Sequence, residues 1–204
     1  MMGLLGKKIG MTSIFDEQGR QTPVTVIEVE PSEVLFTKTK EKNGYSALQL
    51  GIGERKNVTK NKPKKAFIRE IRLRENPAYK KGDFIGIDLF QVGDYLDTTG
   101  ISKGKGFQGG VKRWHWRGGD KSHGSMHHRA VGSIGASSFP SRVHKGKTMP
   151  GHMGCDKKTI QNLKIVKIDK ENKLMFVKGS VPGSNNAYLI LKEALKKPKK
   201  EVKK

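Results

Sequence analysis

Short stretches in which apolar and polar residues alternate occupy both ends of the chain. The segment TPVTVIEVE, residues 22–30, places Val24 and Val26 on one face of a strand and Ile27 and Val29 on the other. Similar strand patterns cover residues 33–40, 45–53 and 82–90, whereas residues 67–75 fit a strand or a helix. The Asn43-Gly44 pair is typical of a tight turn.

The C-terminal part repeats this pattern. Residues 159–169 and 173–181 predict two strands joined by a hairpin turn, and a Pro-Gly loop precedes a last strand that ends near Leu195. Many short strands with little helix predict a mainly β fold, a small barrel or sandwich. The final residues, 196–204, are mostly lysine and predict a solvated, disordered tail.

Residues 101–158 break the alternation. They contain twelve glycines, all six histidines and few aliphatic side chains. Such a segment cannot bury enough apolar surface to offset the entropy cost of its own ordering. We therefore predict an insertion between two halves of a β domain that is either disordered or ordered by a partner.

The charge of the chain narrows the choice of partner. The formal net charge is +22, and residues 101–158 hold twelve basic residues against two acidic ones. A body with this excess favours an anionic partner, nucleic acid first and a membrane surface second. No apolar run approaches the ~20 residues that span a bilayer, and the opening residues do not resemble a signal peptide. The single cysteine, Cys155, fits a reducing cytosol without disulfides.

Two glycine motifs resemble nucleotide-binding loops but lack the pattern that should surround them. GKGFQG, residues 104–109, needs a buried strand before it, a helix after it and an acid about 20 residues on. The preceding YLDTTGIS is too polar, and Asp120 lies too near. GKT, residues 146–148, ends like a phosphate-binding loop, but Ser141 stands where its first glycine is required. We expect no nucleotide cofactor.

The histidines offer a metal-binding alternative. His123 and His127 are four residues apart, with His128 adjacent, as on a zinc-binding helix. Gly124 and Ser125 weaken that helix, and the acids that would orient the imidazoles are nearly absent. With two acids in 58 residues, neither a Ser/His/Asp triad nor a pair of catalytic carboxylates can be argued. We predict no metal site, no cofactor and no enzyme, with a metal-dependent enzyme as the weaker alternative.

RNA binding accounts for more of the segment. Lysine and arginine neutralise phosphates, and Trp114 and Trp116 either stack on unpaired bases or dock on the protein itself. A membrane-surface module is less favoured, because the cations interleave with glycine and form no amphipathic helix. The predicted RNA-binding residues are Lys103, Lys105, Lys112, Arg113, Trp114, His115, Trp116, Arg117, Lys121, His123, His127, His128, Arg129, Arg142, His144, Lys145, Lys147 and His152.

One run of residues carries a family signature: Phe90, Asp97, Gly100, Ser102, Gly104-Lys105-Gly106, Gly109 and Arg113. Position by position it resembles the signature of the universal large-subunit ribosomal protein L-three family, bacterial type. The stretches GLLGKKIGMTSIF, SHGSMHHRAVGSIG, KGKTMPGHMG and FVKGSVPG are similar to further blocks of that family.

This resemblance implies a β-barrel of the translation-factor type formed by residues 1–101 and 157–195, with an RNA-penetrating extension at 102–156. It also implies direct binding to the 3′-terminal region of large-subunit rRNA, nucleation of subunit assembly, and an arm that reaches toward the peptidyl-transferase centre. Ribosomal proteins L-fourteen and L-nineteen are the implied neighbours in a cytoplasmic ribosome, without membrane or small-molecule substrate.

The chain departs from the family at one position. Some bacterial members carry a glutamine before the Met-Gly of this block that is methylated on its side-chain amide. His152 stands there in this chain, so we expect no modification at that site.

Overall fold

The computed structural model describes residues 2–55, 64–73, 75 and 78–197. Residues 103–156 form one compact unit, which we call the extension. The other described residues form a second compact unit, which we call the barrel unit.

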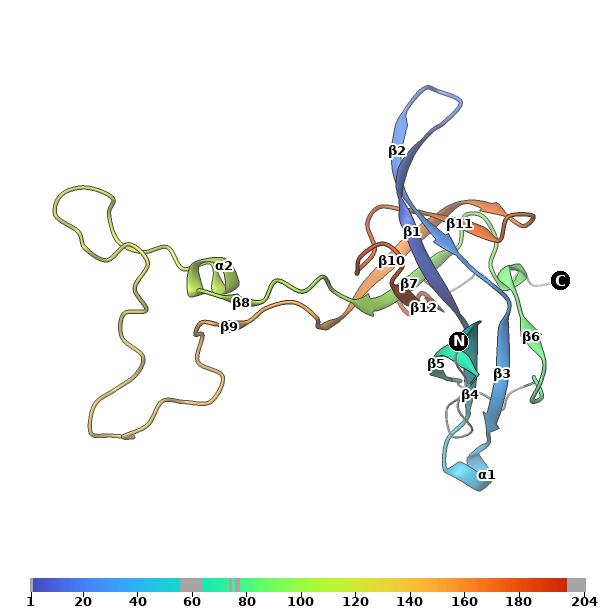
Figure 1. Cartoon of the computed structure of the whole chain (residues 1–204), viewed down its shortest axis with the longest axis horizontal. Coiled ribbons are helices and arrows are strands. Elements are labelled where there is room, and N and C mark those ends of the chain that lie inside the picture. Colours follow the sequence, from blue (N-terminus) through green and yellow to red (C-terminus); the bar gives the residue numbers. More distant parts are fainter. Residues whose placement is uncertain (1, 56–63, 74, 76–77, 198–204) are drawn as a thin grey trace. The chain divides into compact units, whose positions relative to one another are not determined.

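Six antiparallel strands of the barrel unit pair in a closed order, β1-β12-β7-β10-β11-β2, so that every strand pairs with two others (Figure 1). The strands are β1 (Gly3–Phe15), β2 (Gln21–Glu28), β7 (Tyr95–Ile101), β10 (Lys157–Asp169), β11 (Leu174–Lys178) and β12 (Tyr188–Glu193). Closure leaves this sheet without an edge strand.

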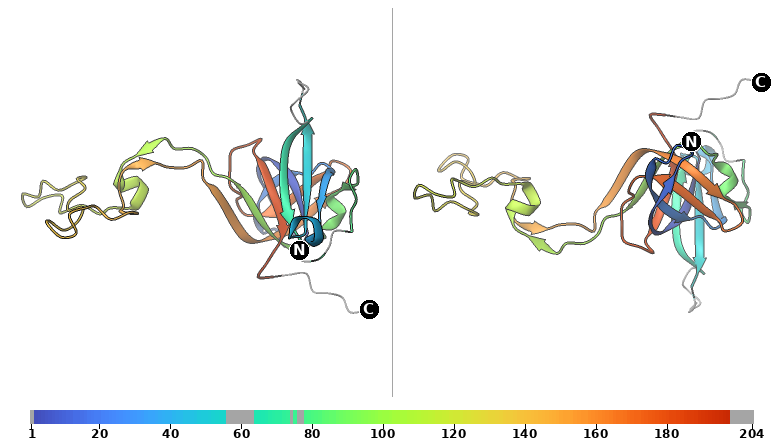
Figure 2. Two further views of the ribbon diagram at one scale, coloured as in Figure 1. Left: turned by 90° about the horizontal axis from the view of Figure 1, so that it is seen from below. Right: turned by 90° about the horizontal axis from the view of Figure 1, so that it is seen from above.

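A second sheet has the order β5-β4-β3-β6. Its strands are β3 (Ser32–Lys38), β4 (Ala47–Glu54), β5 (Lys65–Arg72) and β6 (Phe84–Ile85). The β4–β5 hairpin stands beside the barrel strands in both views of Figure 2. The Asn43-Gly44 turn takes the form of a short helix, α1 (Lys40–Asn43), which ends at Gly44 with φ +77.

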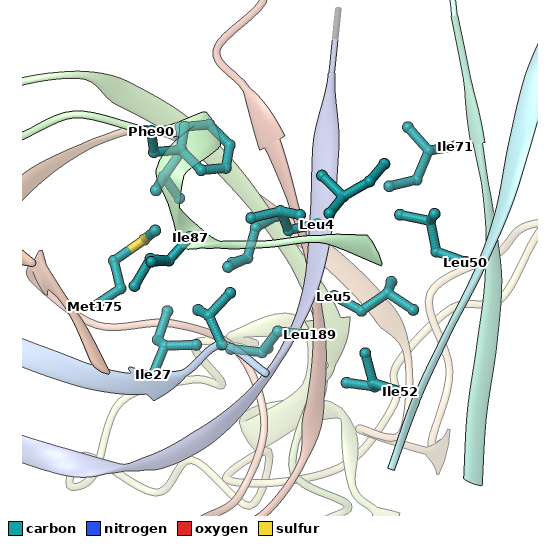
Figure 3. Close-up of a cluster of buried hydrophobic side chains, with 14 of the residues drawn as sticks. Leu4, Leu5, Ile27, Leu50, Ile52, Ile71, Ile87, Phe90, Met175 and Leu189 are labelled. Carbon is teal, nitrogen blue, oxygen red and sulfur yellow. The ribbon is translucent and has the colours of Figure 1, made fainter. Parts of the chain in front are cut away.

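The core explains why two adjacent leucines of β1 are both fully buried. In Figure 3, Leu4 lies on the side of Ile87 and of Leu189 from β12, whereas Leu5 faces Ile52 of the second sheet. Successive side chains of a strand point to opposite faces. Strand β1 therefore lies between two apolar layers and contributes a leucine side chain to each.

The mainly β prediction is confirmed, and the ambiguous residues 67–75 fall largely in strand β5. The prediction for residues 82–90 was wrong beyond Ile85, because residues Ile87–Leu89 form a 3-10 helix, η1. A 3-10 turn places residues three apart on one face, so Ile87 and Phe90 can both enter the core.

The segment YLDTTGIS, judged too polar for a buried strand, forms strand β7. Leu96, Asp97 and Thr98 are all buried there. The Asp97 carboxylate accepts the backbone N–H of Asn162 at 2.9 Å and of Leu195 at 3.3 Å. Because these bonds compensate for lost hydration, a charged residue can occupy the strand.

Two predictions from the sequence stay predictions. The likeness to the translation-factor barrel remains an implication of the family resemblance. Of the predicted disordered tail, residues 198–204 lie outside the described residues. Among the residues that are described, no helix is long and apolar enough to cross a membrane.

Candidate nucleic-acid interface

The two ends of the extension are joined by a short antiparallel ribbon. Strands β8 (Phe107–Gln108) and β9 (Gly151–His152) pair with each other. Lys105 donates its backbone N–H to the Met153 carbonyl at 2.9 Å, and Met153 donates to the Gly106 carbonyl at 2.9 Å. The outgoing and returning chains are therefore held in register by backbone hydrogen bonds.

A glycine at the base of this ribbon allows a very close backbone approach. Gly154 has φ +83, and a Cβ there would lie 2.2 Å from the Lys103 carbonyl oxygen and 2.8 Å from the Gly104 Cα. Neither the conformation nor the space suits another residue. Gly154 is accordingly one of the two buried residues of the extension.

Helix α2 (Gly110–Trp114) follows β8 and ends at His115, whose φ of +59 terminates it. The ring of Trp116 lies against Gly110, where an added Cβ would be 2.1 Å from two ring atoms. Gly110 is the other buried residue of the extension. The helix is thus packed against an aromatic ring that only a glycine can accommodate.

Two side chains of α2 bind the returning chain. The Arg113 guanidinium and the Trp114 indole N–H both donate to the Met149 carbonyl oxygen, at 2.7 and 2.8 Å. The guanidinium carbon also lies 5.2 Å from the centre of the Trp114 ring, within cation–π range. This clamp connects α2 to the segment that leads into β9.

Beyond α2, residues 115–150 run through turns and bends without a helix or strand (Figure 1). One internal contact brings distant parts of this loop together. Gly119 donates to the His127 carbonyl at 2.6 Å, and a Cβ at Gly118 would lie 2.4 Å from the His128 carbonyl oxygen. Backbone contacts, rather than an apolar core, shape the loop.

All the predicted RNA-binding side chains are exposed except Arg113 and Trp116, which are partly buried. The fold brings Arg113 and Trp114 together on one carbonyl and spreads the other cations along the loops. Between Lys103 and Asp156 the sequence holds ten lysines and arginines and two aspartates, a net charge of +8. The extension can therefore offer positive charge along much of its length to an anionic partner.

The histidines do not form the metal face of the alternative hypothesis. His123 has φ +60 and lies in a turn, so His123 and His127 do not share a helix. Throughout the described residues, no group of three or more His, Cys, Asp or Glu side chains could hold a metal ion.

Sequence reasoning missed two kinds of residue in the extension. Gly110 and Gly154 fix its internal contacts, and the WHW motif, which begins four residues after Gly110, gave only a weak signal of this. The other kind is exposed and apolar: Met126 is 94% exposed and Phe139 is 88% exposed. Both lie in a segment that was interpreted from its positive charge.

Comparison with known proteins gives one family. Residues 79–175 match the family model described as Ribosomal protein L3. The chain is 46% identical to large ribosomal subunit protein uL3 of Geotalea daltonii, over 97% of this chain and 99% of that protein. It is 49% identical to the protein of that name from Carboxydothermus hydrogenoformans (95% and 98%), and 44% identical to that of Brachyspira pilosicoli (98% and 97%).

Identity at this level extends over nearly the full length of both chains in each comparison. The signature around Gly104 and Arg113 lies inside the matched region. The chain therefore belongs to the ribosomal protein L3 family, a family of structural, non-enzymatic ribosomal proteins.

Proposed function

We propose that the chain is a structural constituent of the cytoplasmic large ribosomal subunit and that it binds the 3′-terminal region of large-subunit rRNA directly. In this proposal residues 1–101 and 157–195 form the folded body and residues 102–156 enter the RNA, with 196–204 as a basic tail. Family membership supports the ribosomal assignment, and the charge and construction of the extension support direct RNA contact.

The observation that carries the proposal is an ordered segment without a core. The only buried residues between 103 and 156 are the glycines Gly110 and Gly154. Hydrogen bonds and close backbone contacts fix the path of the chain, while its histidines and all its cations except Arg113 are exposed. Such a segment is suited to a channel lined with phosphates, which would supply the contacts that an apolar core supplies elsewhere.

RNA fits this segment better than a membrane surface does. Interfacial membrane binding by a helix requires a broad apolar face opposite a basic face. The one helix of the extension, α2, has only five residues. Folded RNA instead offers phosphates and unpaired bases on several sides, which matches a winding loop with exposed cations.

We further propose that the chain nucleates subunit assembly and that the extension reaches toward the peptidyl-transferase centre beside proteins L-fourteen and L-nineteen. The family resemblance supports these assignments. Any influence on peptide-bond formation would then come from positioned RNA. His152 on β9 is exposed and would contact RNA as an unmodified imidazole.

The test is binding to the 3′ region of large-subunit rRNA beside an unrelated structured RNA of equal length, across a salt series. Affinity for both RNAs should fall as salt rises, because counterion release is blind to sequence. We expect the rRNA fragment to keep at least a tenfold advantage at high salt, about 1.4 kcal/mol. Coincident curves would reduce the chain to a non-specific polycation and overturn the proposal. Flotation with anionic vesicles tests the membrane alternative.

Removing the extension provides a second test. Ile101 of β7 pairs directly with Lys157 of β10, so the two strand ends are neighbours across the sheet. Replacing residues 102–156 by Asn-Gly should therefore join the strands as a hairpin. The buried core cluster lies within residues 4–96 and 165–191, so we expect cooperative unfolding to persist and rRNA affinity to fall. An unfolded variant would show that the barrel depends on the extension.

A further inference from the structure

The two tryptophans are already engaged inside the extension. The Trp114 indole N–H donates to the Met149 carbonyl at 2.8 Å, and the Arg113 guanidinium lies over its ring. The Trp116 ring packs on Gly110. Stacking either indole on a nucleobase would require these contacts to open or would use only the remaining face. The aromatic residues that the sequence made most conspicuous are therefore structural elements of the extension.

Phe139 differs from both tryptophans. Its side chain is 88% exposed, more than any other phenylalanine or tryptophan of the described chain. Within the described residues, no ring stacking or cation–π contact involves Phe139. The Phe139 ring gives the free protein no hydrophobic stabilisation, because its apolar surface stays in contact with water.

The surroundings of Phe139 indicate which partner covers its ring. No aspartate or glutamate occurs between residues 121 and 155. Arg142, Lys145 and Lys147 follow Phe139 within eight residues and are all exposed. A partner that contacts the ring must also tolerate these cations, which favours an anionic surface that carries aromatic faces of its own. Unpaired RNA bases between phosphates have both properties.

We propose that Phe139 is the base-stacking residue of the extension and that its ring stacks on an unpaired nucleobase. The inference rests on the proposed RNA-binding function and adds to it the side chain that reads single-stranded RNA. Neighbouring cations would bind the flanking phosphates, while the ring provides the contact that is independent of salt. Trp114 and Trp116 then act indirectly, by holding the path of the chain.

The test compares Phe139→Leu with Met126→Leu in the full-length protein. Leucine keeps apolar volume at position 139 but removes the π face, and Met126 is a matched exposed apolar residue of the extension without a ring. The probes are a single-stranded RNA carrying 2-aminopurine and the same strand in a fully paired duplex. Fluorescence of 2-aminopurine reports stacking directly, and Phe139→Trp should retain the effect.

We expect Phe139→Leu to lose at least about fivefold in affinity for the single strand, with loss of the 2-aminopurine signal. Its affinity for the duplex should be unchanged, and so should the slope of affinity against salt, because no phosphate contact is removed. Met126→Leu should behave as wild type. Equal losses for both variants, or an unchanged Phe139→Leu, would overturn the inference and favour a protein partner for the ring.

This outcome is separable from the proposed function. If wild-type protein shows no preference for the rRNA fragment, specific rRNA recognition fails. The difference between single strand and duplex still decides the role of Phe139. If the preference for rRNA holds while Phe139→Leu retains full single-strand binding, only the stacking assignment fails.

Discussion

Changing Gly110 to alanine should open the extension at one defined point. An alanine Cβ would lie 2.1 Å from two atoms of the Trp116 ring, so the indole would have to leave its position. Gly109 is the matched control, because a Cβ there meets no atom within 4 Å and its φ of −69 suits alanine.

The size of the effect follows from two opposing contributions. A tryptophan buries roughly 150–250 Å² when fully covered. Trp116 is partly buried, so its displacement exposes about 100 Å² and costs about 2.5 kcal/mol at ~25 cal/mol per Å². Alanine in place of glycine in a helix recovers about 1 kcal/mol. The packed state of Trp116 should therefore lose about 1.5 kcal/mol, roughly a tenfold change in population.

Tryptophan fluorescence measures this change. The chain has two tryptophans, so a Trp114→Phe background isolates the signal of Trp116. In that background Gly110→Ala should shift the emission to longer wavelength and increase quenching by iodide, whereas Gly109→Ala should leave both near the parent values.

Two results would refute this reasoning. The first is a parent protein whose Trp116 is already as accessible to iodide as free tryptophan, which would mean that the free extension does not hold this contact. The second is an unchanged Gly110→Ala spectrum, which would mean that the ring adjusts without leaving its site. Repeating the comparison with both tryptophans present controls for any effect of the Trp114 replacement.

Two further predictions concern the barrel unit. The hydrogen bond from Lys38 lowers the pKa of Glu70, so its stabilising contribution is present above the unfolded pKa and is lost as pH falls through the folded value. Glu70→Gln should therefore flatten the loss of stability in urea melts between about pH 5 and pH 3, and an unchanged acid profile would contradict this. Burial, then the charges of Lys157 and Arg72, lower the pKa of Lys192. The pKa of Lys192 is lower in the folded than in the unfolded state, so the free energy of unfolding rises with pH between these two pKa values. Lys192→Met should raise the denaturant midpoint at pH 7, and a lower midpoint would show that the lysine is stabilising.

Strands with regular alternation were predictable from the sequence, and those with a special environment were not. Strand β2 has Thr25 and Ile27 buried, and Val29 just beyond its end is buried too, as period two requires. Strand β1 escaped notice because Leu4 and Leu5 are buried on opposite faces, which leaves no alternation to detect. A strand shared by two layers can be recognised only when both layers are known.

Strand β7 escaped for a different reason. Its polarity argued against burial, yet Asp97 is 7% exposed and its carboxylate accepts two backbone N–H groups. One donor, Asn162, has φ +58 beside an irregularity in the register of β10. Nothing in the sequence near Asp97 identifies a donor 65 residues away. Polar partners that are distant in sequence are invisible to local pattern, because hydrogen bonding rather than residue type decides the cost of burial.

The extension separates what composition reveals from what geometry reveals. Its charge, its lack of aliphatic residues and its place between two β segments were all legible in the sequence. The number of glycines was equally visible, but not what they contact: Gly110, Gly118 and Gly154 are occupied by close contacts within the extension itself. These contacts do for the segment what a core does for a domain, since they exclude alternative paths of the chain. An insertion that is already partly ordered by its own glycines loses less conformational entropy on binding than a disordered one. More of the free energy of its ionic contacts therefore appears as affinity for the partner.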